Sequence, residues 1–105
     1  EDEEHIFVKS NLKKRKVFLN KIKWIEALGD YIKLVSDDAN IIVLSTLTSF
    51  ENELPKDKFL RIHKSYIVNL EKVEKFSGQN VEVEGKLLPL SRHKRENLEK
   101  ALEEL

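Results

Sequence analysis

Short apolar runs, each interrupted within a few residues by a turn signal, constrain the fold of this chain more than any other feature. The clearest runs are Tyr31–Ser36 and residues 41–45, which are rich in Ile, Leu and Val and are joined by the polar segment DDAN. A polar four-residue loop between two such runs predicts an antiparallel hairpin. Turn signals recur about every 8–12 residues, which predicts a mainly β domain with about seven to nine short strands.

Two segments have a helical period. Residues 46–54 place Leu47, Phe50 and Leu54 on one side before Pro55, which predicts a short central helix with Thr48 and Glu51 at capping-box spacing. Near the end of the chain, Ser91 is expected to cap a terminal helix. The apolar stripe of that helix would consist of Leu98, Ala101, Leu102 and Leu105.

Two further segments are assigned to strands. Ile22–Leu28 fits a helical stripe as well as a strand, but its β-branched and aromatic residues, followed by Gly29 and Asp30, favour a strand. Residues 86–90 are expected to form the last strand, and Pro89 cannot donate a ladder hydrogen bond, so this strand should lie at a sheet edge or leave the sheet there.

The size and charge of the chain suit one domain with a polyanionic partner. Its 105 residues include no cysteine and no apolar run of membrane-spanning length, which fits a reducing cytoplasm and no membrane partner. Residues 1–4 are all acidic and are interpreted as a linker remnant or disordered end, and residues 5–105 as the domain. The net charge of zero hides a basic middle, because residues 5–95 carry 18 Lys and Arg against 11 Asp and Glu. A solubilising lysine surface would explain the same charge.

Residues 59–70 (FLRIHKSYIVNL) join apolar and cationic side chains most closely. If the segment is one extended strand, Arg61, His63 and Ser65 share one face. A histidine flanked by an isoleucine is more often a structural imidazole than a contact residue. Lys64 is either a contact residue or a lysine whose stem covers apolar neighbours.

The start of the terminal helix breaks a local rule. Arg92, His93, Lys94 and Arg95 would place cations on its first turn, where the helix dipole prefers acids. A bound phosphate would reverse the sign of this cost. A frayed terminal helix that tolerates the cost is the alternative.

Three ordered motifs carry a family resemblance. Residues 25–34 (IEALGDYIKL), residues 59–69 (FLRIHKSYIVN) and residues 88–92 (LPLSR) with the basic run that follows resemble the LytTR DNA-binding domain, an output module of bacterial response regulators. The resemblance implies an elongated stack of small antiparallel β-sheets with a short central helix and a C-terminal helix. It also implies double-stranded DNA as the partner, bound by a pair of domains on a repeated site, and a receiver domain in the full-length chain.

The matching positions give the candidate DNA contacts. These are Asp30, Tyr31, Lys33, Lys64 and Arg92, with His93, Lys94 and Arg95 as a more basic version of the family ending. Lys64 departs from the arginine frequent in the family, so a phosphate contact is expected there rather than base reading.

Other functions have weaker support. The three histidines lack metal-ligand spacing, no glycine-rich phosphate loop is present, and Ser65 with His63 lacks a third positioned group, so neither an enzyme nor a cofactor is expected. A β-rich protein-interaction or RNA-binding module is the alternative. The aromatic residues do not form the stacking platform typical of RNA-binding sheets.

Overall fold

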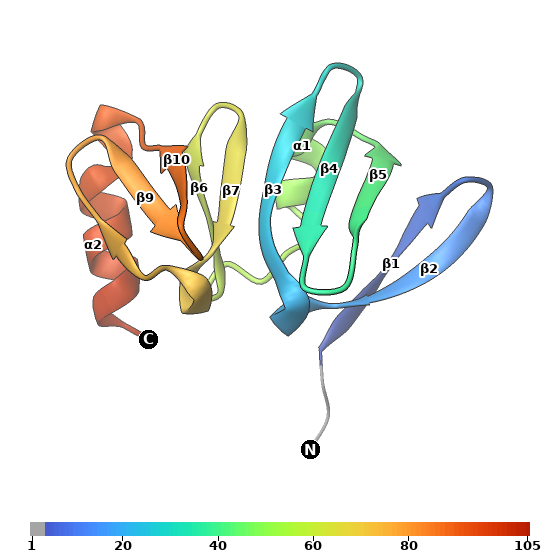
Figure 1. The fold of residues 1–105 in the computed structure, drawn as a ribbon, viewed down its shortest axis with the longest axis horizontal. Helices are drawn as coiled ribbons and strands as arrows, with labels where there is room; N and C mark the ends of the chain where they lie inside the picture. Colours follow the sequence, from blue (N-terminus) through green and yellow to red (C-terminus); the bar gives the residue numbers. More distant parts are fainter. Residues whose placement is uncertain (1–3) are drawn as a thin grey trace.

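Three antiparallel sheets and two α-helices form the fold in the computed structural model, which describes residues 4–105 (Figure 1). In chain order the elements are β1 (His5–Ser10), β2 (Lys13–Phe18), η1 (Leu19–Lys21), β3 (Ile22–Leu28), β4 (Tyr31–Ser36), β5 (Asn40–Leu44), α1 (Leu47–Glu51), β6 (Phe59–His63), β7 (Tyr66–Asn69), η2 (Leu70–Lys72), β8 (Lys75–Phe76), β9 (Asn80–Val83), β10 (Lys86–Pro89), η3 (Arg92–Lys94) and α2 (Arg95–Glu103). The η elements are single 3-10 turns. The expected mainly β architecture is confirmed.

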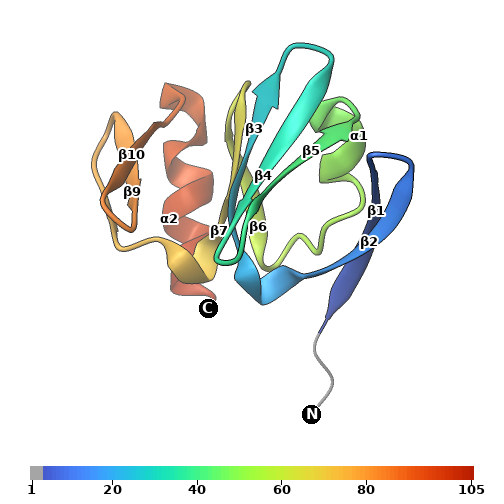
Figure 2. The same cartoon turned by 45° about the vertical axis from the view of Figure 1, so that its right-hand side comes forward.

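A five-stranded sheet in the order β5-β4-β3-β7-β6 is the centre of the molecule. One of its faces packs against α1 and the β1–β2 hairpin, with Ile25, Ile32 and Phe50 in the core between them. The other face is covered over β6, β7 and Trp24 of β3, where a second core forms around Ile62, Val68 and Leu98. Figure 1 and Figure 2 show that α2 and the β9–β10 strands both lie on this side, next to β6 and β7.

The smaller sheets flank the central one. β1 and β2 pair with each other alone, and β8, β9 and β10 form a three-stranded sheet in which β10 is an edge strand. The edge position expected for the strand containing Pro89 is therefore confirmed. The β3, β4 and β5 strands also form as expected, with Leu28 opposite Tyr31 and Tyr31 opposite Leu44.

Residues 59–70 are not one extended strand. They form a hairpin, in which β6 and β7 pair antiparallel with Arg61 opposite Ile67 and His63 opposite Tyr66, and Lys64 and Ser65 make the turn. The expectation that Arg61, His63 and Ser65 share one strand face is therefore wrong. Arg61 faces α1, whereas the His63 ring lies 5.9 Å from the ring of Tyr66 on the opposite face.

The helix caps also differ from the sequence expectation. Thr46 rather than Thr48 caps α1, since its hydroxyl accepts a hydrogen bond from the Ser49 amide at 3.0 Å. Ser91 makes no side-chain cap, and α2 begins only at Arg95 after the 3-10 turn η3. Within the expected apolar stripe, Leu98 is fully buried and Ala101 and Leu102 are partly buried, but Leu105 is exposed.

The described part of the N-terminal segment is held to the body. The Leu19 amide donates to the carbonyl of Glu4 at 3.0 Å, and the Glu4 carboxylate pairs with Lys58. This contact with the carboxylate raises the pKa of Lys58. Residues 1–3, the rest of the segment interpreted as a linker or disordered end, lie outside the described residues.

Candidate nucleic-acid interface

The β3–β4 turn presents the first group of candidate residues. Gly29 has a φ of 63°, which a residue without a Cβ adopts at little cost, so two residues suffice to reverse the chain. Asp30 is exposed at the tip, and Tyr31 keeps 46% of its surface exposed although it is paired in β4. The side chains expected at this loop tip therefore face solvent.

The β6–β7 turn presents Lys64, whose side chain is exposed. Arg61 fixes the backbone of this turn, since its guanidinium donates to the carbonyl oxygens of His63 at 3.3 Å and Lys64 at 2.6 Å. The same guanidinium contacts Thr48 Oγ1 at 2.9 Å and a Glu51 carboxylate oxygen at 3.2 Å, both on α1. Through Arg61, the position of the Lys64 backbone therefore depends on α1.

His63 also stabilises the turn. Its Nδ1 accepts a hydrogen bond from the Ser65 amide at 3.1 Å, which places the proton of a neutral imidazole on Nε2. Its side chain is half-buried. This geometry fits the interpretation of His63 as a structural imidazole bonded through one ring nitrogen.

The connection from β10 to α2 presents Arg92 and His93, both exposed, and the partly buried Lys94. The Ser91 amide donates to the carbonyl of Ile62 at 2.8 Å, which anchors this connection to β6 beside the β6–β7 turn. The cations expected on the first turn of the helix therefore lie mostly in η3, ahead of α2. The first turn of α2 itself contains Glu96.

These three loops meet at one edge of the molecule, here called the loop edge and defined as residues 29–31, 64–65 and 91–94. The Ala27 amide donates to the carbonyl of Ser65 at 2.9 Å, which joins β3 to the β6–β7 turn, and the Ser91–Ile62 bond joins the third loop. Figure 1 shows the three turns along the upper side. Backbone hydrogen bonds thus bring together segments more than twenty residues apart.

Lys33 lies away from this edge. It follows Tyr31 on the uncovered face of the central sheet, and its ammonium is 3.6 Å from Glu26. The other oxygen of the Glu26 carboxylate accepts from the Trp24 indole at 2.8 Å, so Glu26 is held in place between the two side chains. A partner of Lys33 would therefore have to compete with a positioned carboxylate.

Arg95 is also partly engaged within the protein. Its guanidinium pairs with Glu99 one helical turn on at 3.5 Å and lies close to Gly78, where an added Cβ would be 3.3 Å from the nearest guanidinium nitrogen. Both Arg95 and Glu99 are largely exposed, so this ion pair is weak. Arg92 and Lys64, in contrast, have no ion pair among the described residues.

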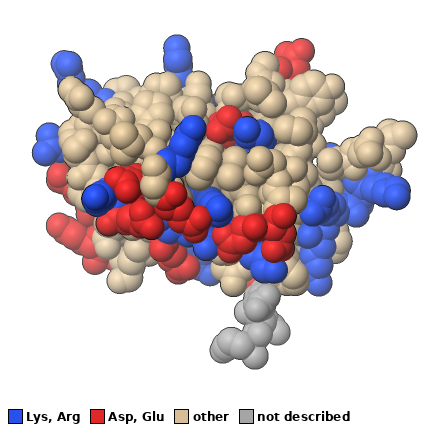
Figure 3. Space-filling model, viewed as in Figure 1, with Lys and Arg blue, Asp and Glu red and all other residues tan. Residues whose placement is uncertain are grey.

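Charge is unevenly distributed over the surface. In Figure 3 Asp and Glu gather in a band across the lower part of the face shown, while Lys and Arg cover the side of the β1–β2 hairpin. Lys and Arg also project from the upper side, over the β6–β7 turn and the start of α2, and an acidic group stands apart from them at the β3–β4 turn. The Lys23 ammonium contacts Glu84 at 2.8 Å, and this hydrogen bond raises the pKa of Lys23.

Arg61 is the residue at this edge whose role the sequence did not reveal. The alternation of an extended strand would place it on one face with His63, whereas it holds the turn that carries Lys64. Its neighbours Thr48 and Glu51 come from a helix about ten residues earlier, and nothing in the local pattern connects them to it. Only the tertiary structure makes this link.

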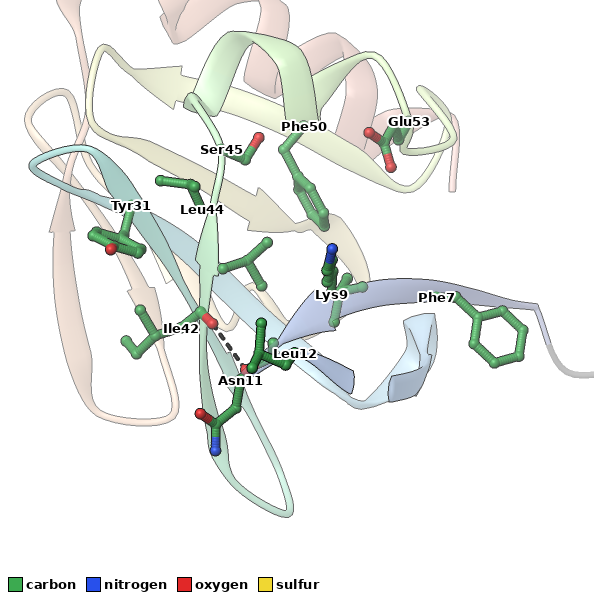
Figure 4. A pocket seen from close by; sticks show the side chains of 13 residues that line it. Phe7, Lys9, Asn11, Leu12, Tyr31, Ile42, Leu44, Ser45, Phe50 and Glu53 are labelled. Carbon is green, nitrogen blue, oxygen red and sulfur yellow. Dashed lines mark hydrogen bonds between the residues drawn. The ribbon is translucent and has the colours of Figure 1, made fainter. Parts of the chain in front are cut away.

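A hollow of about 650 Å³ adjoins the loop edge at Tyr31 and lies between the β1–β2 hairpin and β5 (Figure 4). Its lining is mainly apolar and includes Leu12, Ile42, Leu44 and Phe50. Within residues 4–105 no three acidic or histidine side chains are grouped to hold a metal ion. The helices in this part of the chain are also too short or too polar to cross a membrane.

The arrangement defines a class: a small mainly β domain that presents basic and aromatic side chains on loops at one edge of stacked sheets. Comparison with protein families identifies it further, because the sequence profile of the LytTr DNA-binding domain matches residues 13–103. The chain therefore belongs to the LytTR DNA-binding domain family.

A solved structure has the same fold. The LytTr DNA-binding domain of a putative methyl-accepting/DNA response regulator from Bacillus cereus is similar with a TM-score of 0.78 and 22% sequence identity. The match covers 96% of this chain and 98% of that one. None of the curated proteins compared with the chain matches it.

Proposed function

We propose that this domain binds double-stranded DNA sequence-specifically through the loop edge, without catalysis, as the output domain of a transcriptional regulator. The observation that carries the proposal is the convergence of the three motif-bearing loops, joined by the Ala27–Ser65 and Ser91–Ile62 hydrogen bonds. Membership of a DNA-binding family supports it. The Bacillus cereus neighbour belongs to a response regulator, which supports a receiver domain in the full-length chain. Binding by a pair of domains on a repeated site is part of the proposal.

The candidate residues divide between reading bases and gripping the backbone. The forked guanidinium of Arg92 can pair with O6 and N7 of one guanine. Lys64 is a point charge on a flexible stem and suits phosphate oxygens, and so does Lys33 once it leaves Glu26. Asp30 and Tyr31 at the β3–β4 turn would contact the adjoining segment of DNA. His93, Lys94 and Arg95 would add charge beside Arg92.

The first experiment is selection of bound sequences from a random duplex pool. Enrichment of a repeated short motif is expected, and no enrichment at low salt would refute sequence-specific binding. Fluorescence polarisation with the selected duplex, a scrambled duplex and single-stranded RNA of equal length then separates DNA binding from an RNA-binding module. Tighter binding to RNA than to either duplex would favour the module.

The division of roles is tested with single variants at one salt concentration. Arg92→Ala should lose ~1–3 kcal/mol on the selected duplex and relax the base preference at one position. Lys33→Ala should weaken the selected and scrambled duplexes by similar factors, since a phosphate contact carries no sequence information. If Arg92→Ala weakens both duplexes equally, Arg92 grips phosphate and base reading lies at the Asp30–Tyr31 turn.

A further inference from the structure

The β1–β2 hairpin carries a dense group of cations that the loop edge does not include. This group, here called the hairpin cations, consists of Lys9, Lys13, Lys14, Arg15 and Lys16, and no Asp or Glu occurs between residues 5 and 25. All five side chains are exposed. Lys16 lies over the ring of Phe18, with its ammonium 5.2 Å from the ring centroid.

The hairpin cations differ from most other cations in lacking carboxylate partners. None of the five forms an ion pair with a described residue, whereas eight Lys and Arg side chains elsewhere do. A further three cations without such a pair, Lys64, Arg92 and Lys94, lie at the loop edge. The unpaired cations thus gather mainly on two surfaces. A group of like charges without counter-charges favours a polyanionic partner.

The hairpin is held in a fixed direction. Val8 and Val17 are buried in the core on its inner face. Near its turn, the Ser10 hydroxyl donates to the carbonyl of Ile42 on the edge strand β5 at 3.0 Å, which Figure 4 shows as a dashed line. Six-residue strands extend about 20 Å, so the hairpin carries its cations along the edge of the body beside β5.

The hairpin and the loop edge can be reached by one long partner. In Figures 1 and 2 the hairpin turn points to the same upper side as the β3–β4 and β6–β7 turns. Figure 1 also places the hairpin and α2 at opposite ends of the long axis, whose extent is 40 Å. Duplex DNA covers this length with about 12 base pairs at 3.4 Å each, and it presents phosphates all along it. The acidic band across the lower face would repel DNA placed there.

We propose that the β1–β2 hairpin is a second DNA contact, which grips the phosphate backbone of the duplex beyond the segment bound by the loop edge. This inference rests on the proposed function and extends it. The contact is independent of sequence, because lysines on a β-ribbon that meets the backbone read charge rather than base edges. Its role is to lengthen the footprint of each domain on the hairpin side.

The test compares two triple variants that remove the same charge. Lys13→Gln, Lys14→Gln and Arg15→Gln together neutralise the outer end of the hairpin. Lys56→Gln, Lys86→Gln and Lys100→Gln together form the control, since these side chains are also exposed and have no ion pair in the described part of the chain. Each variant is titrated over a series of salt concentrations with the selected site centred in a duplex of about 30 base pairs, longer than the ~12 that one domain covers.

The hairpin triple variant should bind the selected and scrambled duplexes about 10–100-fold more weakly at low salt, by the same factor for both. The slope of log affinity against log salt should fall by about 2–3, or 0.9 for each phosphate that the variant no longer neutralises. The control triple variant should keep a slope near that of the wild type. Equal behaviour of the two triple variants, with wild-type binding intact, would overturn the hairpin contact and leave the proposed function standing.

A second measurement maps the hairpin contact on the DNA. Trimming the duplex on one side of the selected site, then on the other, should weaken wild-type binding more on the side that the hairpin reaches. Hydroxyl-radical footprinting should show protected sugars on that side, and the hairpin variant should leave them open to cleavage. Equal protection in wild type and variant would overturn the proposal. Failure of the wild type to bind any duplex would overturn the proposed function, and the hairpin contact with it.

Discussion

Replacing Arg61 with alanine should destabilise the domain and weaken DNA binding together. The Arg61 guanidinium makes four hydrogen bonds, to the carbonyls of His63 and Lys64 in the β6–β7 turn and to Thr48 and Glu51 of α1. In the alanine variant the turn loses its link to α1 while the Lys64 side chain itself remains. The displaced turn should then present Lys64 poorly to a partner.

The size of the loss follows from these contacts. Hydrogen bonds from charged donors contribute ~1.5–3 kcal/mol each when shielded from water. The Arg61 side chain keeps 20% of its surface exposed, so water can replace part of each lost hydrogen bond. We therefore expect a loss of about 1 kcal/mol for each of the two turn carbonyls. Glu51 is 36% exposed, and the pair with it adds only ~0.5 kcal/mol after screening. The expected total of about 2–3 kcal/mol lowers Tm by roughly 10–20 °C for a domain of this size.

Thermal unfolding and urea titration measure the loss, with Lys56→Ala as the control because Lys56 is exposed and has no ion pair in the described part of the chain. The Tm of Arg61→Lys should lie between the Tm of Arg61→Ala and that of the control. The lysine ammonium lacks the forked guanidinium that binds the turn and the helix at the same time. DNA affinity is measured at a temperature where every variant remains folded. A Tm for Arg61→Ala within about 2 °C of the wild type would mean that water replaces these bonds, and Arg61 would not be what stabilises the turn.

Three further predictions concern stability. Lys64→Ala and Arg92→Ala should each change the free energy of unfolding by less than ~0.5 kcal/mol, because both side chains are exposed; a large loss in calorimetry would make them structural residues. Leu98→Ala should cost ~2–5 kcal/mol in urea unfolding, because Leu98 is fully buried in the second core, and Leu105→Ala, at an exposed site, should cost little. Gly29→Ala should cost about 1 kcal/mol from backbone strain alone, since the added Cβ meets no atom; an unchanged Tm would show that the turn relaxes.

Hairpins marked by polar or glycine turns could be predicted from the sequence, and the hairpin of residues 59–70 could not. Gly29-Asp30 and the segment DDAN predict turns, because they contain residues that tolerate tight backbone geometry. Lys64 and Ser65 form a turn in which neither residue has a positive φ. Most residue types can adopt the backbone conformation of such a turn. Their turn is specified by Arg61 and His63 through hydrogen bonds, and such contacts leave no local signature.

The helix ends show the same limit. Thr46 and Thr48 are equally good capping residues, and the pairing of Thr48 with Glu51 suggested the wrong one. Thr48 instead accepts from Arg61, which lies thirteen residues away. At the second helix, the Ser91 amide is bonded to the carbonyl of Ile62, and a 3-10 turn separates Ser91 from α2. In both cases a contact distant in the chain overrides a local preference.

The candidate interface was predictable as a set of motifs, but not as a distribution of free charge. The sequence shows an excess of cations in residues 5–95. Its motifs make Lys33, Lys64 and Arg92 equal candidates for DNA contact. The structure separates them, because Lys33 already faces Glu26, which the Trp24 indole holds in place. A paired lysine must give up its carboxylate before it can release a counterion from DNA, so it contributes less to affinity than an unpaired one. The number of cations without a carboxylate neighbour is therefore a better guide than net charge to where a polyanion binds.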